Sequence, residues 1–363
     1  MKLENYIKRI LEREYTPSIS ILVSYKDQVV YKKTFGYLNV VGSKIKATNK
    51  TIYDLASLTK PLVIAPLILF LLQNKEIKLG DNVNKFFPEF NFDFTILNLL
   101  IHTSGLPGWI PFYAYNRDYL DVFNLIRENR KASKRVVYSC VGYILLSFII
   151  NKVINGDFRE LYDELFIKKL KLRRTFLKVP EKFKKECAAT ENGSKYEKEM
   201  VKKMFPKLFK NIKWREYLIQ GETHDNNAYY CGGCAGNAGL FSDIEDMNVL
   251  LNEFKVDNAI ILKPEYVKLF YENFTPCKIS HRTIGFKLNS SIITSGGKYL
   301  SKQSIGHNGF TGTSMWIDPI KELDIIVLTN RIHPRYKTLN FNRIRRHIHK
   351  LISKELIRRD YCK

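Results

Sequence analysis

The sequence is poor in several features that would assign a protein to a special class. Its 363 residues include only 6 cysteines, without the regular spacing of a disulfide framework. It contains no zinc-finger, helix-turn-helix or RNA-binding motif. It has no internal repeats and no long segment of glycine, proline or serine that would act as a linker. What remains is a chain whose 45% hydrophobic residues are enough for a substantial core.

The chain also lacks a long apolar run. The run at residues 61–72 is about a dozen residues, whereas a membrane-spanning helix needs about 20. Residues 1–14 alternate charged and apolar side chains, which is typical of an amphipathic helix. They have neither the apolar core nor the cleavage site of a signal peptide. We therefore expect the chain as written to stay in the cytoplasm, without a transmembrane segment.

Acidic residues are scarce relative to basic ones. Lysine and arginine number 59 against 36 aspartates and glutamates, which gives a formal net charge of +23. Such a balance is compatible with binding to nucleic acid or a membrane surface. The basic residues are spread along the chain, however, with modest clusters only at 168–174 and 343–350. A general compositional bias explains the charge better, and we expect no nucleic-acid partner.

The most informative stretch is Asp54-Leu-Ala-Ser57-Leu-Thr-Lys60-Pro61, which leads into the apolar run. Ser57 and Lys60 are three residues apart and would share one face of a helix, so their side chains can meet. A serine hydroxyl becomes a good nucleophile when a neighbouring base accepts its proton, and a lysine amine can be that base. Burial and a second cation nearby would both lower the pKa of the amine.

This motif alone does not prove a nucleophile. Ser-x-x-Lys also occurs at Ser43/Lys46 and Ser295/Lys298, where glycines and polar residues predict turns. A serine at position 57 could also cap the helix. Because the helix is apolar on every face, it must be buried. In either case Ser57 would lie at the N-terminal end of a central helix, where free backbone N–H groups can hold an oxyanion.

The rest of the chain predicts strands near both ends and helices between them. Predicted strands are at residues 18–25, 29–36, 283–288, 291–295, 304–317 and 323–330. Predicted helices are at residues 95–101, 118–154 with an interruption before Tyr138, 158–170, 200–209, 242–254 and 339–358. The economical architecture is α/β (α+β): one antiparallel sheet from both chain ends, flanked by helices. We expect a sheet subdomain at about 1–56 and 225–363 and an inserted helical subdomain at about 57–224.

Several motifs in order resemble the serine β-lactamase-related family, which groups class C β-lactamases, DD-peptidases and family VIII esterases. They are Thr51-Ile-Tyr-Asp-Leu-Ala-Ser57-Leu-Thr-Lys60-Pro61, Leu100-Ile-His-Thr-Ser-Gly105-Leu-Pro107, Tyr138-Ser-Cys-Val-Gly-Tyr143, Gly239-Leu-Phe-Ser242 and Gly306-His-Asn-Gly309-Phe-Thr-Gly312. The resemblance covers roughly residues 15–350, and residues 221–228 and 330–334 are most similar to its penicillin-binding-protein-like branch. It implies a β-lactamase/transpeptidase-like fold and an enzyme that uses no metal or cofactor.

The resemblance also implies roles for individual residues. Ser57 would be the acylated nucleophile, Lys60 its activating amine, and Tyr138 the group that passes a proton to the leaving group. The backbone N–H groups of Ser57 and Phe310 would form the oxyanion hole. Further residues would bind the substrate, namely His307, Asn308 and Gly309 of the strand motif, Cys140, His224 and Asn227.

Two residues depart from the family pattern or vary within it. His307 stands where β-lactamases have a lysine, as in DD-peptidase and some esterase members, and an imidazole holds a carboxylate less firmly than an ammonium. Cys140 stands where the family usually has asparagine or aspartate, and a thiol is a weak hydrogen-bond partner. These differences affect proton transfer and the preference for peptide-like substrates.

The sequence thus predicts a serine hydrolase that acts on an ester or amide of a small molecule or peptide through an acyl-enzyme. It would be an esterase or a D-alanyl carboxypeptidase, with weak β-lactamase activity at most. Cys140 keeps one alternative open, a catalytically degraded member that binds a peptidoglycan-like or anionic ligand. A further alternative is a basic protein that binds nucleic acid or a membrane surface. Cys231 and Cys234 with His224 lack a fourth ligand, so we expect no zinc site.

Overall fold

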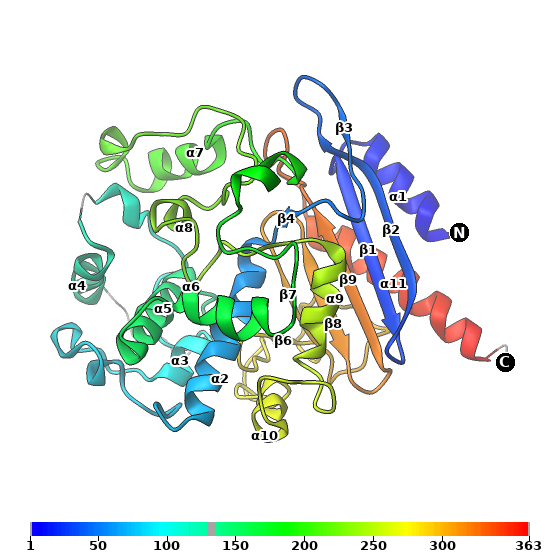
Figure 1. The fold of residues 1–363 in the computed structure, drawn as a ribbon. Coiled ribbons are helices and arrows are strands. Elements are labelled where there is room, and N and C mark those ends of the chain that lie inside the picture. Colours follow the sequence, from blue (N-terminus) through cyan, green and yellow to red (C-terminus); the bar gives the residue numbers. More distant parts are fainter. Residues whose placement is uncertain (1, 116, 130–134, 362–363) are drawn as a thin grey trace.

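The computed structural model describes residues 2–115, 117–129 and 135–361 (Figure 1). Part of the segment before Tyr138 that interrupts the predicted helical region, residues 130–134, lies outside the described residues, as does Cys362. Within them, a mixed α/β fold contains one antiparallel sheet with helices on both faces. The predicted fold class is therefore confirmed.

The sheet has the strand order β3-β2-β1-β9-β8-β7-β6. Its strands are β1 (Ser18–Tyr25), β2 (Gln28–Asn39), β3 (Ile45–Lys46), β6 (Lys287–Leu288), β7 (Ile305–Asn308), β8 (Ser314–Asp318) and β9 (Leu323–Thr329). The two chain ends meet where β1 pairs with β9, from Ile19 opposite Thr329 to Tyr25 opposite Leu323. This pairing confirms that both ends of the chain build the sheet.

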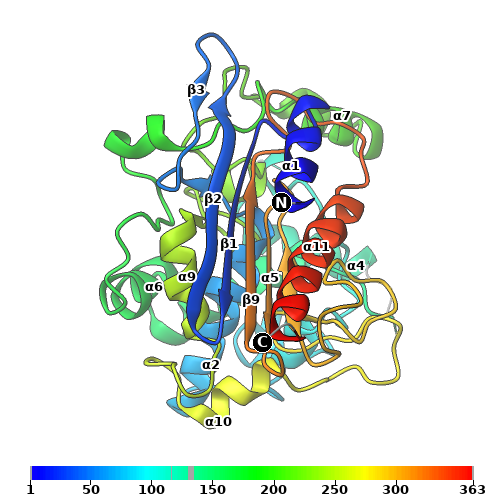
Figure 2. The ribbon, with the colours of Figure 1, turned by 90° about the vertical axis from the view of Figure 1, so that its right-hand side faces the viewer.

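Strand β1 is buried on both faces because its side chains alternate between two layers. Ile19, Ile21 and Val23 pack into an outer cluster with the first and last helices, α1 (Lys2–Glu12) and α11 (Phe341–Tyr361). Figure 2 shows these two helices next to each other on the outer face of the sheet. Leu22 points the other way, into the main core.

The main core lies between the sheet and the remaining helices. These are α2 (Ala65–Gln73), α3 (Ile96–Leu100), α4 (Tyr119–Asn129), α5 (Cys140–Ile154), α6 (Phe158–Tyr162), α7 (Lys195–Met204), α8 (Asn226–Tyr230), α9 (Ile244–Asn252) and α10 (Pro264–Val267). A separate pair of short strands, β4 (Tyr53–Asp54) and β5 (Phe241–Ser242), holds the start of the central helical segment.

The central segment is not the single uniform helix that the sequence predicted. A 3₁₀ turn (Ala56–Leu58) is followed by a π-helical turn (Lys60–Ile64) and then by α2. Proline lacks an N–H donor, so Pro61 and Pro66 interrupt the regular α-helical bonding. Residues Ala56–Gln73 are long and apolar enough to span a membrane, but 78% of this stretch is buried inside the protein, as in a core helix.

Other boundaries also differ from the prediction. Strand 291–295 does not form, because Asn289 Nδ2 donates to the carbonyls of Gly297, Leu300 and Ser301 and folds the segment into a loop. The predicted strand 304–317 is a hairpin, β7 and β8, with a turn between them. The helix predicted at 200–209 lies earlier, as α7, since Pro206 excludes a regular helix there.

Candidate active site

Ser57 lies in a sharp turn between β4 and the central helical segment. A carboxylate oxygen of Asp54 accepts from the N–H of Ala56 (2.8 Å), and the hydroxyl of Thr59 donates to the Ala56 carbonyl (2.7 Å). Ala56 has a φ of 48°, in the left-handed region that residues other than glycine rarely adopt. Strain of this kind is often found at functional sites. The turn leaves the Ser57 side chain partly exposed in a pocket.

Lys60 is fully buried and connects three parts of the site. Its Nζ donates to Ser57 Oγ (3.0 Å), to the Asn237 carbonyl (2.9 Å) and to Cys140 Sγ (3.4 Å). The predicted contact between the serine and the lysine is therefore present. Leu55, and not Ser57, occupies the N-cap position of the helical turn. This position argues against the interpretation of Ser57 as a helix cap.

Opposing influences act on the pKa of Lys60. Burial lowers it, whereas the anionic forms of Cys140 and Tyr138 raise it, and the net pKa is raised. The sequence predicted a lowered pKa, so that prediction is wrong for this site. Burial also raises the pKa of the Cys140 thiol, so the thiol is neutral near pH 7 and adds no charge there. Lys60 Nζ also lies 5.1 Å from the centre of the Tyr138 ring, so the amine and the phenol are neighbours in the site.

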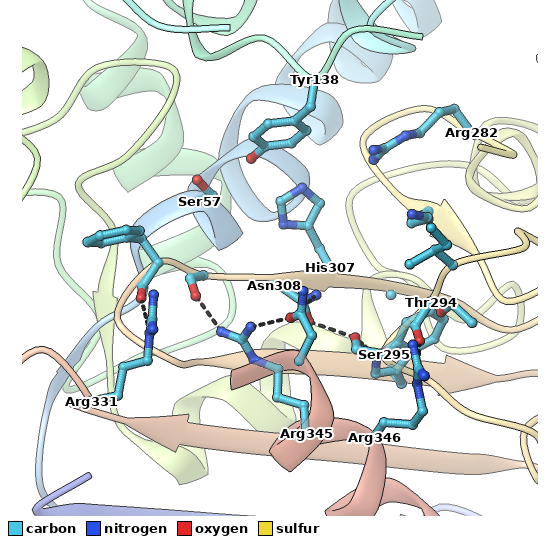
Figure 3. Close-up of a pocket in the computed structure, with 17 residues that line it drawn as sticks. Ser57, Tyr138, Arg282, Thr294, Ser295, His307, Asn308, Arg331, Arg345 and Arg346 are labelled. Atoms are coloured by element: carbon cyan, nitrogen blue, oxygen red, sulfur yellow. Dashed lines mark hydrogen bonds between the residues drawn. The ribbon is translucent and has the colours of Figure 1, made fainter. Parts of the chain in front are cut away.

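Tyr138 lies directly before α5 and next to Lys60. The centre of its ring is 5.1 Å from Lys60 Nζ and 5.8 Å from the ring of His307. Its hydroxyl points toward Ser57 (Figure 3). On its other side, the guanidinium carbon of Arg282 lies 5.6 Å from the ring centre. The phenol thus stands between the nucleophile and a second cation.

The turn after β7 approaches the nucleophile closely because Gly309 has no side chain. A Cβ atom at this position would lie 2.5 Å from the carbonyl oxygen of Leu55. The hydroxyl of Thr313 donates to the same carbonyl (3.1 Å) and fixes the turn against the Ser57 segment. Within the described part of the chain, the N–H of Phe310 donates to no acceptor, and Phe310 lines the pocket with Ser57. This geometry is compatible with an oxyanion hole.

His307 and Asn308 also line the pocket. His307 is buried, and burial, with the charges of Lys60 and Arg282, lowers its pKa well below the ordinary value. The imidazole is therefore neutral at pH 7, a weaker anion site than the partly charged ring expected from the sequence. The Asn308 Oδ1 accepts from Ser295 Oγ (2.9 Å), which holds that side chain along the pocket wall.

The pocket has a volume of about 400 Å³ and a strongly basic lining. None of its described lining residues is acidic, whereas five are basic, namely Arg282, Lys287, Arg331, Arg345 and Arg346 (Figure 3). Of these five, only Arg331 lies in a stretch that resembles the family, residues 330–334. Arg335, just beyond that stretch, is exposed. An excess of one charge around a cleft attracts ligands of the opposite charge.

Three residues predicted to bind the substrate are not among those that line the pocket, namely Cys140, Asn227 and His224. Asn227 is buried and connects backbone segments, because its amide donates to the Ile110 carbonyl (2.8 Å) and accepts from the Phe112 N–H (2.9 Å). His224 is buried behind Phe310, with 5.7 Å between ring centres, and its Nε2 lies 3.2 Å from a carboxylate oxygen of Glu191. Both contacts are structural, so the prediction that these residues bind the substrate needs correction.

A model of the family described as Beta-lactamase matches residues 3–347. The chain belongs to the beta-lactamase family. A relative from Salmonella typhi, provisionally named a D-alanyl-D-alanine carboxypeptidase, is 29% identical over 92% of this chain and 82% of its own length.

Solved structures within this beta-lactamase fold are also similar. The octameric penicillin-binding protein homologue from Pyrococcus abyssi has a TM-score of 0.69 and 22% identity, over 91% of this chain and 73% of its own. EstCE1, a hydrolase with promiscuous acyltransferase activity, has a TM-score of 0.73 and 14% identity, over 96% and 97%. At these identities the likeness shows a common fold.

Proposed function

We propose that this protein is a serine hydrolase that forms an acyl-enzyme on Ser57. Its substrate would be an ester or amide of a small molecule or peptide, as for an esterase or a D-alanyl carboxypeptidase. The observation that carries the proposal is the 3.0 Å contact between Lys60 Nζ and Ser57 Oγ beside an open pocket. The carboxypeptidase name of the Salmonella relative supports a peptide-like substrate.

Acylation begins when Ser57 Oγ attacks the substrate carbonyl. Its proton passes to the pair formed by Lys60 and Tyr138, where Lys60 Nζ accepts it in the fraction of molecules whose amine is neutral. The negative charge that develops on the carbonyl oxygen is held by the N–H groups of Ser57 and Phe310. Tyr138 then delivers a proton to the leaving group, which departs and leaves an ester on Ser57.

Deacylation reverses these roles. Water attacks the acyl-Ser57 ester, its proton passes to the Lys60–Tyr138 pair, and the acid product leaves with the serine restored. We expect weak β-lactamase activity at most. A neutral His307 offers a poor contact for the carboxylate of a β-lactam, and Cys140 offers a poor partner for a side-chain amide.

One alternative retains specific support. Cys140 contacts Lys60 at 3.4 Å, a long and weak contact where a carboxylate or amide would hold the amine more firmly. A protein with a poorly held lysine could bind an anionic ligand in the basic pocket without turnover. This degraded member of the family is the second candidate function.

Intact-protein mass spectrometry separates the two candidates. The wild-type protein and Ser57→Ala are incubated with a fluorophosphonate, a fluorescent penicillin and p-nitrophenyl acetate. We expect an adduct with at least the fluorophosphonate, located by peptide mapping on Ser57 and absent from the variant. An unmodified wild-type protein that still binds anionic ligands would support the degraded member. An adduct retained in Ser57→Ala would refute the assignment of the nucleophile.

A further inference from the structure

Two basic residues of the pocket lie opposite each other in an isolated β-bridge. Arg282 and Lys287 form an antiparallel bridge at the start of β6, so their side chains project from the same face. Both line the pocket that contains Ser57. Like charges directly opposite each other destabilise a sheet. The position is therefore unfavourable unless something else balances the charge.

Among the residues that the structure describes, none supplies an anion for this pair. Arg282 is only 8% exposed, yet its Nε has no hydrogen-bond partner. In the described chain, neither Arg282 nor Lys287 has a carboxylate partner or a side-chain hydrogen bond. Burial lowers the pKa of Lys287 to about 8, and the charge of Arg282 acts in the same direction.

The other three basic residues of the pocket differ because backbone carbonyls hold them. Arg331 Nε donates to Phe310 (2.8 Å), and Arg346 Nε donates to Thr294 (2.9 Å). Arg345 donates to carbonyls at the β7–β8 turn, including that of Gly312 (3.0 Å). These bonds fix the orientation of the three guanidinium groups. Arg282 and Lys287 also line the pocket, but their side-chain donors have no acceptor among the described residues.

We propose that Arg282 and Lys287 form a subsite for a doubly charged anion, a phosphate monoester carried by the substrate. A carboxylate would balance one of the two cations, whereas a phosphate monoester carries about −1.5 to −2 charges at pH 7 and has three acceptor oxygens. The inference rests on the proposed function for the reaction, and it adds the class of substrate. His307, neutral at pH 7, supplies no competing cation here.

The position of Tyr138 indicates which part of the substrate carries the phosphate. In the proposed reaction Tyr138 protonates the leaving group, and Arg282 lies on the side of the phenol away from Ser57 (Figure 3). A leaving group that passes Tyr138 would reach the cation pair. The substrate class is therefore an acyl ester or amide whose alcohol or amine part carries a phosphate.

Three aryl acetates with matched acyl groups test the subsite. They are phenyl acetate and its analogues with a carboxylate or a phosphate monoester at the para position of the phenol. Each is cleaved with water to acetate and the free phenol, so the acyl group is constant and the para substituent of the leaving phenol is what differs. We expect the kcat/KM for the phosphate ester to exceed that for phenyl acetate by about tenfold or more, from one or two charge-assisted hydrogen bonds.

Variants locate the effect. Lys287→Gln and Arg282→Gln should each reduce the ratio of kcat/KM between the phosphate ester and phenyl acetate by about tenfold. The exposed Lys298 lies in the same third of the chain, and Lys298→Gln, which removes one positive charge there, should leave the ratio unchanged. If Arg282→Gln fails to fold, Lys287→Gln alone still tests the proposal. The proposal is overturned if both variants keep the ratio, or if the carboxylate ester is favoured as strongly as the phosphate ester.

A binding measurement tests the subsite without requiring turnover. Isothermal titration of wild-type protein with phenyl phosphate and with benzoate should show tighter binding of phenyl phosphate, weakened about tenfold by Lys287→Gln. If phenyl phosphate binds in this way but no ester is cleaved, the proposed function fails and the subsite stands. If esters are cleaved and phenyl phosphate does not bind, the subsite fails and the proposed function stands.

Discussion

Lys60 and Lys287 are two desolvated lysines at one site, and their pKa values shift in opposite directions. Lys60 has three acceptors from the chain, and its pKa is raised because ionisable neighbours outweigh burial. Lys287 has Arg282 opposite it and no acceptor among the described residues, and its pKa is lowered to about 8. Burial alone therefore does not determine how a lysine behaves.

The different surroundings of Lys60 and Lys287 correspond to two different roles. The surroundings of Lys60 are complete without a ligand, as expected for a group that must hold Ser57 in a fixed geometry before the substrate arrives. The surroundings of Lys287 lack a counter-charge, as expected for a group that meets its partner on the substrate. A protein can keep such an unbalanced pair only at a cost in stability, which is common at functional sites.

The largest expected effect comes from removing the hydroxyl group that Lys60 contacts. Ser57→Ala should lower ester hydrolysis by on the order of 10⁴-fold or more, because a nucleophile and its base act as a unit. Steady-state rates with p-nitrophenyl acetate measure the loss. Ser43→Ala is the matched control, since Ser43 is exposed in another Ser-x-x-Lys sequence. Near-normal turnover by Ser57→Ala would refute the nucleophile.

The third Ser-x-x-Lys serine is not a neutral control. Ser295 Oγ donates to Asn308 Oδ1 (2.9 Å) and accepts from Trp316 Nε1 (3.3 Å). The sequence placed Ser295 in a turn with no role at the site. Its replacement would loosen the wall of the pocket, so a loss of activity there would not identify a second nucleophile.

A smaller loss of activity should follow from displacing the turn after β7, which carries the Phe310 N–H proposed for the oxyanion hole. A methyl group added by Gly309→Ala would lie 2.0 Å from Thr313 Oγ1 and 2.5 Å from the Leu55 carbonyl oxygen, so the turn after β7 would have to move away from the Ser57 segment. A displacement near 1 Å can cost about 10²-fold in rate. We expect kcat/KM for p-nitrophenyl acetate to fall by that order. Gly80→Ala, where the added atom meets nothing within 4 Å, is the control. Unchanged kcat/KM in Gly309→Ala would argue against an oxyanion hole at this turn.

Sequence analysis worked best where the determining residues are close together in the chain. The Ser57–Lys60 contact spans three positions, and the hairpin of β1 and β2 is likewise local. The pairing of the two chain ends was also predictable, because the β-branched runs near each end need a common sheet. These features follow from local spacing and from composition.

The electrostatics of the site could not be predicted in the same way. The groups that contact Lys60 besides Ser57 lie 80 and 177 residues away, so no local pattern indicates the direction of its pKa shift. The facing of Arg282 and Lys287 depends on a bridge across a turn, where the sequence predicted one continuous strand at 283–288. Asn227 was placed in the pocket by its motif, yet backbone segments from another part of the chain use its amide.

Replacing Cys140 should give Lys60 and a substrate amide a better hydrogen-bond partner. Cys140→Asn replaces a weak thiol contact with an amide that can bind both Lys60 and a substrate amide. One additional hydrogen bond is worth about 1 kcal/mol or slightly more, so nitrocefin cleavage should rise by about tenfold. An activated aryl ester needs neither contact, and its rate should change little. Flat rates for nitrocefin and p-nitrophenyl acetate would contradict this account, as would a wild-type protein as fast as a dedicated β-lactamase.

The smallest expected effect is the change in protein stability when the charge of Lys287 is removed. Its pKa of about 8 in the folded protein is below the ordinary lysine value of 10.5, first because of burial and then because of Arg282. Between these two pH values the unfolded chain binds more protons at this position than the folded protein does, so the contribution to stability rises with pH through this window. Below pH 8 both states are protonated, and the full cost of burying the charge remains.

Lys287→Gln should therefore melt about 1–3 °C higher than wild type at pH 7, and this difference in melting temperature should close as the pH approaches 10. Thermal melts at constant ionic strength, with Lys298→Gln as control, measure the gap. A variant that is less stable than wild type at pH 7, or a gap that does not change with pH, would show that Lys287 carries no uncompensated charge.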